Sequence, residues 1–403
     1  MYTDEELAAL ADTTVERVRR MAELKIIEPG SAGFDPPDIQ LVRVAEAMDG
    51  AGVGLDDIGR LIADGHYSMA WGSLLYPQPV PTSDLTLEQA CAELDLPIAF
   101  VRRFFIVALQ LPAPEPDQRM RDDDLELLRI GSMVFNLAGR DEDVGIASAR
   151  YFGENLRRLA ESQVRFFREH FEEPMFAMGL SQREAIDALV QVAAPLMPLG
   201  ARVVDLLYQR HLEHYSMEDV VANMEMTMHR AGMVQRTTEH PPAIAFCDLT
   251  GSTQLTEVLG DEGAARMADR LAELLRLTTS RHGGRVVKLL GDGAMLHFRG
   301  PTDAARAGLE LVEAASQSEL PPLRMGVHIG PVVFRDGDYY GRTVIVASRV
   351  ADRIGPSEVV LTAEAVEEVT SNDLAFDDMG AMDLKGVAEP VKLFRARATW
   401  AEL

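Results

Sequence analysis

The sequence predicts a multi-domain protein in which an all-α amino-terminal half precedes an α+β domain. With 403 residues the chain is too long for one ordinary core, so two or three domains are expected. Apolar residues recur at helical spacing through most of residues 1–235, whereas short apolar strands alternate with helices from residue 241 onward. We expect a linker at residues 231–242 to join the two halves.

Residues 1–72 are expected to form the first unit. Thr3 opens one helix with a capping-box-like start, residues 14–24 make a second helix, and residues 36–48 make a third. This order resembles the winged helix-turn-helix of MerR-type regulators, in which the recognition helix would begin at Val15.

A similar register recurs downstream and predicts a second unit of the same kind. The matching positions are Thr3 with Thr86, Glu5 with Glu88, Val18-Arg19-Arg20 with Val101-Arg102-Arg103, Pro29 with Pro112, and residues 39–44 with 125–130. We infer two tandem helix-turn-helix-like units joined by the proline-rich stretch 76–84. The second would begin a helical regulatory domain, residues 85–235.

The acidic balance of the first unit disfavours DNA binding. Residues 1–64 hold 14 Asp or Glu against 6 Lys or Arg, whereas contacts with DNA phosphates need the opposite sign. Arg17, Arg19 and Arg20 could form a local basic patch, or they could simply solvate one face of a helix. We therefore favour a protein-protein or regulatory role for this unit over DNA binding.

The composition of the whole chain predicts an acidic cytoplasmic protein. No run of about 18 apolar residues could span a membrane, and no signal segment opens the chain. Cys91 and Cys247 are the only cysteines and both have apolar neighbours, so no disulfide framework is expected. A net charge of −25 disfavours nonspecific attraction to DNA or to anionic membranes.

Two aspartates lie in motifs that suit metal ligands. Asp248 ends an apolar strand that begins at residue 243, and Asp292 lies in the Gly-Asp-Gly turn of a predicted hairpin over residues 286–298. A strand end and a neighbouring hairpin tip can share one edge of a sheet. There the two carboxylates could bind Mg²⁺, which favours one or two carboxylates together with substrate phosphates. The pattern predicts metal-assisted phosphoryl transfer on a nucleoside triphosphate.

Five motifs, in order along residues 241–398, resemble the class III nucleotidyl cyclases, especially bacterial adenylate cyclases. The resemblance implies a ferredoxin-like α+β catalytic domain over residues 241–403 and a homodimer whose active site is shared between subunits. The motifs are Phe-Cys-Asp-Leu-Thr-Gly-Ser-Thr (246–253), Lys-Leu-Leu-Gly-Asp-Gly (288–293), Arg-Met-Gly-Val-His-Ile-Gly-Pro-Val (324–332), Asp-Tyr-Tyr-Gly-Arg-Thr-Val-Ile-Val-Ala-Ser-Arg (338–349) and Leu-Lys-Gly-Val-Ala-Glu-Pro-Val (384–391).

The resemblance implies a role for each matching polar residue. Asp248 and Asp292 would coordinate two Mg²⁺ or Mn²⁺ ions. The turn formed by Thr250, Gly251 and Ser252, together with backbone amides of residues 249–252, would cradle phosphate oxygens.

Further matching residues would recognise the base and stabilise the transition state. Lys288 and Asp338 fall at the positions that select the base and favour ATP over GTP. Arg349 would stabilise charge on the α-phosphate, and Lys385 is a candidate for the triphosphate tail or an ordinary surface lysine.

One position departs from the family pattern. The family usually has an asparagine four residues before the arginine, and this chain has Ile345. Residues 345 and 349 would lie one helical turn apart, beside an apolar stripe of Val346, Val350 and Ile354. We expect Ile345 to face the nucleotide rather than the core, and to slow the reaction or alter the placement of the ribose.

Residues 143–235 are helical in pattern, with apolar stripes over residues 155–171, 183–197 and 201–215. The region resembles the all-helical regulatory region that precedes the catalytic domain in some mycobacterial-type adenylate cyclases. His211 and His214, three residues apart near the linker, could form a pH-sensitive contact or be ordinary surface histidines.

The sequence therefore favours a homodimeric adenylate cyclase that converts ATP to cyclic AMP and pyrophosphate under control of its helical half. One alternative is a catalytically weakened nucleotide-binding signalling module, with Ile345 marking the loss. Another is a DNA-binding regulator that responds to a nucleotide. A guanylate or pyrimidine cyclase is a lesser option.

Overall fold

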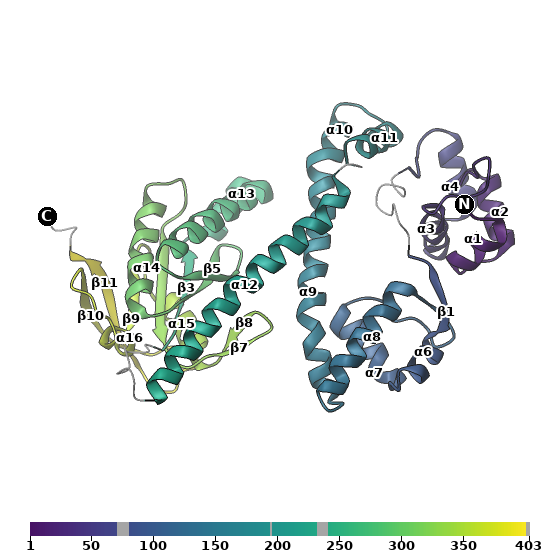
Figure 1. The fold of residues 1–403 in the computed structure, drawn as a ribbon. Coiled ribbons are helices and arrows are strands. Elements are labelled where there is room, and N and C mark those ends of the chain that lie inside the picture. The colour runs from purple at the N-terminus through teal and green to yellow at the C-terminus, as the bar shows by residue number, and fades with distance from the viewer. Residues whose placement is uncertain (71–79, 194–195, 232–240, 400–403) are drawn as a thin grey trace. The chain divides into compact units, whose positions relative to one another are not determined.

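The computed structural model describes residues 1–70, 80–193, 196–231 and 241–399 (Figure 1). The chain divides into two compact units, Met1–Met224 and Glu225–Leu403. No helix within the described ranges is both long enough and apolar enough to cross a membrane.

Over the ranges that the structure describes, the first compact unit is helical apart from two short strands, which confirms the predicted all-α half. Its elements are α1 (Asp4–Ala11), α2 (Val15–Glu23), α3 (Asp38–Gly50), α4 (Leu55–Ala63), β1 (Thr82–Thr86), α6 (Leu87–Glu93), α7 (Ile98–Arg103), the π-helix η1 (Phe104–Leu109), β2 (Arg119–Arg121), α8 (Asp122–Leu137), α9 (Glu142–Phe167), the π-helix η2 (Arg168–Glu172), α10 (Glu173–Ala177), α11 (Gln182–Ala193) and α12 (Met197–Arg230), which continues into the second unit.

The predicted repeat is visible in the local geometry of the first unit. Thr3 and Thr86 each accept a hydrogen bond from the backbone of the residue three positions later, and Glu6 and Gln89 complete the two capping boxes. Each of these helices is followed by an aspartate in the left-handed backbone region: Asp12 (φ 58°) and Asp95 (φ 52°). The two segments share these local features, and their identification as helix-turn-helix units stays a prediction.

The predicted proline-rich linker is partly a strand. Residues 71–79 lie outside the described ranges, but β1 pairs antiparallel with β2. Arg43 donates hydrogen bonds to the carbonyl oxygens of Leu10 and Val80 and to the hydroxyl of Thr82. The carboxy-terminal end of the stretch is therefore held to β2 by backbone pairing and to α1 and α3 by the half-buried guanidinium of Arg43.

The later helices have other limits than the sequence pattern indicates. The sequence predicts helices over 155–171, 183–197 and 201–215, whereas α9 begins at residue 142, α11 ends at residue 193 and α12 extends to residue 230. The predicted stripes of residues 155–171 and 201–215 face outward, whereas that of residues 183–197 is partly buried through Ala185, Ile186 and Ala193. Exposed members of the first two are Leu156, Leu159, Val164, Leu206, Leu207, Leu212 and Tyr215, and beyond the predicted stripes Val220 and Val221 are exposed as well.

A seven-stranded sheet forms the centre of the second unit. The elements are β3 (Ala243–Leu249), α13 (Ser252–Arg281), β4 (Arg285–Leu289), β5 (Gly293–Phe298), α14 (Pro301–Ser316), β6 (Leu323–Ile329), β7 (Val333–Arg335), β8 (Asp338–Tyr340), α15 (Arg342–Arg353), β9 (Val359–Thr362), α16 (Ala363–Glu367), β10 (Leu374–Met382) and β11 (Val391–Ala398). The strand order is β10-β11-β9-β6-β3-β5-β4, and β6 and β9 pair in parallel. The run β3-α13-β4-β5-α14-β6 has the β-α-β-β-α-β order of a ferredoxin-like fold, which confirms the predicted α+β class.

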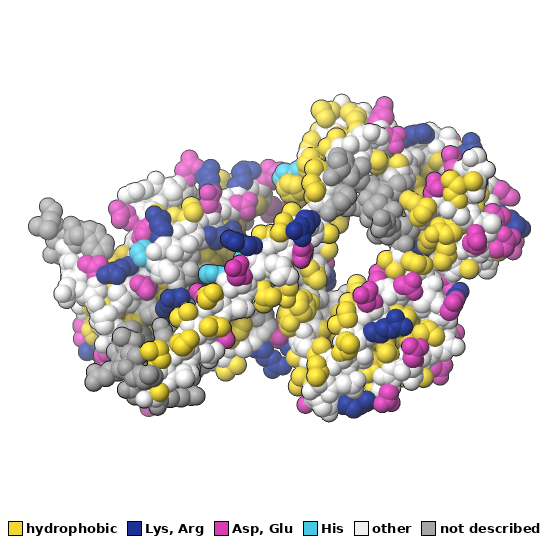
Figure 2. Space-filling model, viewed as in Figure 1, with side chains coloured by type: hydrophobic (Ala, Val, Ile, Leu, Met, Phe, Trp, Pro, Cys, Tyr) yellow, Lys and Arg dark blue, Asp and Glu magenta, His cyan; other side chains and the backbone are white. Residues whose placement is uncertain are grey.

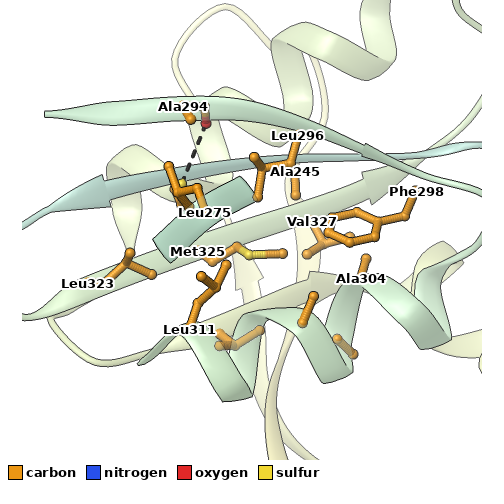
Figure 3. Close-up of a cluster of buried hydrophobic side chains, with 14 of the residues drawn as sticks. Ala245, Leu275, Ala294, Leu296, Phe298, Ala304, Leu311, Leu323, Met325 and Val327 are labelled. Carbon is orange, nitrogen blue, oxygen red and sulfur yellow. Dashed lines mark hydrogen bonds between the residues drawn. The ribbon is translucent and has the colours of Figure 1, made fainter. Parts of the chain in front are cut away.

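The two faces of this sheet carry different coverings. Helices α13 and α14 pack on one face over the main core (Figure 3), whose members include Leu275, Leu296, Phe298, Leu311 and Val327. Helix α15 packs on the opposite face, which we call the α15 face, through Val346, Ala347 and Val350. Gly326 of β6 permits this close approach, because a Cβ there would lie 2.4 Å from the backbone nitrogen of Ala351.

Helix α13 contains a break that changes one prediction. The sequence predicts Leu255, Leu259, Leu271, Leu274 and Leu275 on the core side of the helix. Leu271 and Leu275 are buried, but Leu259 is half exposed, because Gly260 (φ 70°, ψ 178°) interrupts the helix immediately after it. The side chain of Leu255 lies outside the described residues.

Candidate active site

Asp248 and Asp292 lie at the same edge of the seven-stranded sheet. Asp248, near the end of β3, is paired with Gly293 at the start of β5, and Asp292 directly precedes that glycine. The Asp292 carbonyl oxygen accepts a hydrogen bond from the Leu249 N–H (3.0 Å), which ties the hairpin tip to the strand end. The structure brings the two residues to one edge of the sheet, and the role of their carboxylates as metal ligands stays a prediction.

Each of these carboxylates accepts a hydrogen bond from a polar side chain. Asp248 Oδ2 accepts a hydrogen bond from Arg324 Nη2 (2.8 Å), and Asp292 Oδ2 accepts one from the Ser252 hydroxyl. No cluster of three or more His, Cys, Asp or Glu that could hold a metal occurs among the described residues. A cation here would therefore depend on two carboxylates and on oxygens from a substrate, a donor set that fits Mg²⁺.

Arg324 lies beside Asp248 and was assigned no role from the sequence, although it begins the motif of residues 324–332. It is the direct partner of Asp248 in the β3–β6 register. Its Nη1 donates to the Ile354 carbonyl oxygen (3.1 Å), and its Nε is buried without a hydrogen-bond partner. The signal in the sequence is its place at the start of a predicted strand. A position at the start of a strand does not identify the side chain's neighbour until the adjacent strand and its register are known.

The predicted phosphate-binding turn is smaller than expected. Gly251 adopts φ 81°, which turns the chain from β3 into α13. The backbone N–H groups of Leu249 and Thr250 already donate to the carbonyl oxygens of residues 292 and 322, so they do not contribute to the predicted cradle. Of the predicted cradle, Gly251, Ser252 and the Thr250 hydroxyl remain as candidate contacts for a phosphate. A cavity of about 490 Å³ lies beside this turn, lined in part by Ser252 and Asp292.

The two predicted base-recognition residues meet. Lys288 Nζ, on β4, donates to Asp338 Oδ2 of β8 (2.5 Å), and the backbone N–H of Tyr339 donates to Asp338 Oδ1 (2.8 Å). Lys288 is opposite Met295 in the β4–β5 register, and Met295 belongs to the cluster under α15. Lys288 therefore lies on the α15 face together with Asp248 and Arg324.

Helix α15 carries the remaining predicted residues of this face. Val346, Val350 and Ile354 are buried, as predicted for the apolar stripe. Ile345 is 52% exposed and is not part of the core. Arg349 lies one turn further along. Its Nη1 donates to Asp352 (2.8 Å).

Three described residues of the predicted and observed site elements hold a buried polar atom without a hydrogen-bond partner. Among the residues that the structure describes, the buried side-chain nitrogen and oxygen atoms without a hydrogen-bond partner are Thr250 Oγ1, Arg324 Nε and Arg349 Nε. Buried polar groups are normally hydrogen-bonded, so each exception requires an explanation. Two of the three are donors on guanidinium groups, which suit an anionic ligand with several acceptor oxygens.

Of the three other predicted residues, one lies in the second compact unit and two lie on helix α12 in the first. Lys385 is exposed in the turn between β10 and β11, at the opposite edge of the sheet from β4 and β5. His211 and His214 are exposed on α12, and His214 Nε2 lies 3.9 Å from a carboxylate oxygen of Glu218.

Comparison with known families identifies the carboxy-terminal part of the chain. Residues 234–396 match the family described as adenylate and guanylate cyclase catalytic domain. This part of the chain is a class III cyclase domain. The family match covers β3 to β11 and all the residues of the α15 face described above.

Curated relatives of the cyclase extend the similarity beyond this domain. An adenylate cyclase from Streptomyces coelicolor is 30% identical over 62% of this chain and 63% of the relative. A pH-sensitive adenylate cyclase from Mycobacterium tuberculosis is 32% identical over 64% of each chain. The match thus spans a little under two thirds of these relatives, and it is longer than the cyclase domain, so it reaches into the helical half.

Among solved structures, the adenylyl cyclase CyaB from P. aeruginosa is 22% identical, with a TM-score of 0.35, over 41% of this chain and 97% of that chain.

Proposed function

We propose that this protein is an adenylate cyclase, which converts ATP to 3′,5′-cyclic AMP and pyrophosphate at a site shared between two copies of the chain. The observation that carries the proposal is a pair of unpartnered buried donors, one on Arg324 beside Asp248 and one on Arg349 of α15, the helix that covers this face of the sheet. Relatives that are themselves named adenylate cyclases support ATP as the substrate.

Base recognition follows from the chemistry of Lys288 and Asp338. Adenine N1 accepts a hydrogen bond and its 6-amino group donates one, so a lysine donor and a carboxylate acceptor complement it. Guanine presents the reverse order. Because the two side chains bond to each other (2.5 Å), the base must enter between them and take over both partners. This exchange favours adenine, whereas guanine would leave both groups unpaired.

The phosphate chemistry is assigned to the residues around Asp248. Two Mg²⁺ or Mn²⁺ ions held by Asp248 and Asp292 would lower the pKa of the ribose 3′-hydroxyl and neutralise the triphosphate. Arg324 offsets the charge of Asp248 and offers an unpaired Nε to phosphate oxygens. Arg349 stabilises charge on the α-phosphate while the 3′-oxygen bonds to phosphorus and the bond to the pyrophosphate oxygen breaks. The 3′ proton is released to water.

Exposed apolar side chains around the base-recognition pair support a shared site. Phe334 of β7 is 59% exposed, and the hairpin of β7 and β8 that carries it extends from the domain (Figure 1). Other exposed apolar residues near Lys288 and Arg349 in the chain are Leu289, Leu290, Val333 and Ile345. Clustered apolar surface marks interaction sites. A second copy of the domain would cover this surface and bring its own Asp248 and Asp292 to the nucleotide.

The helical half carries a second exposed apolar surface, on α12, for contact with a second copy of the chain. Hydrophobic side chains lie at the surface along much of α12 (Figure 2). They include Leu199, Val203, Leu206, Leu207, Leu212, Met217, Val220, Val221 and Met224. A helix that is apolar on several sides is normally buried. We propose that α12 pairs with a second copy, and that this pairing transmits regulation to the cyclase domain.

Histidines on α12 are candidates for the regulatory signal. His211 and His214 are exposed on the helix that leads toward the cyclase domain, and one matched relative is named as pH-sensitive. The test replaces both by asparagine and follows activity from about pH 5.5 to 8. The proposal predicts a flatter pH profile in the double variant. A profile identical to the wild type would exclude these histidines as the sensor.

One assay tests the main proposal. Purified full-length protein is incubated with each of the four nucleoside triphosphates and with Mg²⁺ or Mn²⁺, and products are resolved by mass spectrometry. Cyclic AMP and pyrophosphate from ATP are expected, and Asp292→Ala should abolish both. Absence of any cyclic nucleotide with either metal would overturn the proposal.

A second function, a nucleotide-binding signalling module with weakened catalysis, is favoured by the exposed Ile345 where the family has asparagine. It predicts ATP binding without product in the same assay.

A DNA-binding regulator has less support, because the arginines of α2 are already paired with acids. The pairs are Arg17 with Glu46 and Asp49, Arg19 with Asp4 and Glu5, and Arg20 with Glu23 and Asp56.

A further inference from the structure

One buried tyrosine holds the β7–β8 hairpin to the cyclase domain. The hairpin is a two-stranded sheet outside the seven-stranded sheet, and every residue of β7 is exposed. Tyr339, in the middle of β8, is 7% exposed, whereas the next residue, Tyr340, is 50% exposed. The position of the hairpin therefore depends on what Tyr339 contacts.

Tyr339 rests on a pair of residues that face each other across β4 and β5. Its ring stacks on the imidazole of His297, with ring centroids 4.9 Å apart and planes 9° from parallel. Its hydroxyl accepts a hydrogen bond from Arg285 Nη2, and the same guanidinium carbon lies 5.7 Å from the ring centroid. Arg285 and His297 are direct partners in the strand register. Stacking and a charged donor together fix both the plane and the outer end of the ring.

A bulge in β4 places this support beside the base-recognition lysine. Side chains three residues apart in a regular strand point to opposite faces of the sheet. The β4–β5 register shifts between Val286 and Lys288, so that Arg285 pairs with His297 and Lys288 with Met295, two residues away on β5. The extra residue turns Arg285 and Lys288 to the same face. The anchor of Tyr339 and the partner of Asp338 are thus built on one strand.

The backbone links the anchor directly to Asp338. Asp338 immediately precedes Tyr339, and its Oδ1 accepts the Tyr339 N–H (2.8 Å) while its Oδ2 accepts Lys288 Nζ (2.5 Å). Both carboxylate oxygens therefore depend on the place where Tyr339 is seated. A shift of the ring would move the carboxylate away from the lysine.

We propose that Tyr339, Arg285 and His297 form a clamp that positions Asp338 against Lys288 and thereby sets the preference for adenine over guanine. The inference rests on the proposed cyclase activity. It assigns to these three residues a positioning role, since none of them needs to touch the nucleotide. Loss of the clamp would impair the reading of the base more than the chemistry at the phosphates.

The test compares kcat/KM for ATP and for GTP in full-length variants. Tyr339→Leu removes the stack and the hydrogen bond, and the ATP-to-GTP ratio is expected to fall about tenfold, in the range that one pocket contact contributes to discrimination. Tyr339→Phe and Arg285→Met each remove the hydrogen bond, and each should lower the ratio less. The double variant should lower the ATP-to-GTP ratio no further than the more impaired single variant, because both substitutions remove the same hydrogen bond.

Tyr340→Leu is the matched control, since it makes the same change one residue away on the exposed side of β8. Its ratio should equal that of the wild type. A wild-type ratio in Tyr339→Leu, an equal loss for both nucleotides, or the same fall in Tyr340→Leu would each overturn the clamp. If Tyr339→Leu fails to fold, Tyr339→Phe and Arg285→Met decide alone.

Failure of the clamp is separable from failure of the proposed function. A wild-type protein that forms no cyclic nucleotide would overturn the function. The clamp is then read from the ratio of the ATP and GTP dissociation constants, measured by calorimetry with Mg²⁺ in the same variants. A ratio lowered in Tyr339→Leu but not in Tyr340→Leu would support the clamp, and an unchanged ratio would refute it.

Discussion

Replacing Ile345 by asparagine should raise cyclase turnover. Ile345 is half exposed, and it lies one helical turn, about 6 Å along the axis, from Arg349 on α15. An asparagine there could donate or accept a hydrogen bond near the ribose while Arg349 acts on the α-phosphate. A positioned hydrogen bond that acts in the transition state contributes about 2.7–4 kcal/mol, or roughly 10²–10³ in turnover.

The same substitution should affect folding little. Isoleucine and asparagine have similar helix propensities, and the site is not part of the core, so a change in unfolding free energy within about 0.5 kcal/mol is expected. The assay is steady-state cyclic AMP formation at saturating ATP, with the oligomeric state measured in parallel by light scattering. Arg353→Asn adds the same amide at another exposed position of α15 and should give no gain. An Ile345→Asn variant that still dimerises but turns over no faster would refute the reasoning.

Three further predictions concern the interface, the pH dependence and the packing of α15. Phe334→Asp should lower activity and shift the protein toward monomer in analytical ultracentrifugation, because it charges the exposed apolar hairpin; a fully active dimer would contradict this. Burial lowers the pKa of His328 below its ordinary value of 6.5 and outweighs the charge of Glu364, which raises it. The contribution of His328 to stability is therefore present above that pH and is lost as the pH falls below it. His328→Gln should reduce the drop in melting temperature on the acid side, and an unchanged dependence of melting temperature on pH would contradict this. Gly326→Ala should destabilise the cyclase domain by about 1–3 kcal/mol in chemical denaturation, because its Cβ would meet the backbone of Ala351, and a neutral effect would show that α15 moves freely.

Local sequence patterns were sufficient for the order of elements but not for their exposure. Caps such as Thr3 and Thr86 marked helix starts because a side-chain oxygen and a nearby backbone N–H define them locally. Apolar spacing indicated helices within residues 143–235, but it could not tell a buried apolar stripe from an exposed one. The break at Gly260 was also invisible to periodicity, since a single residue with positive φ redirects the helix without altering the pattern.

In the candidate site, too, local sequence patterns did not predict the tertiary contacts of every residue. Motifs located Asp248, Asp292, Lys288 and Asp338, because each lies in a turn or hairpin with a recognisable sequence. Arg324 begins the motif of residues 324–332 but was given no role, since its place beside Asp248 comes from the β3–β6 register and not from the motif. The amides of the phosphate turn were misjudged for the related reason that their acceptors, at residues 292 and 322, are distant in sequence.

One face of one sheet accounts for the arrangement of the whole constellation. Strict alternation along β3 and β6 sends Asp248 and Arg324 to the α15 face while their neighbours fill the core beneath α13 and α14. On β4 alternation alone would separate Arg285 from Lys288, and the bulge restores them to one side. If β4 kept the same residues but continued without the bulge, Lys288 would turn toward the apolar core under α13 and α14, where its ammonium group would have no partner. The bulge is therefore as much a requirement of the proposed base recognition as the lysine itself.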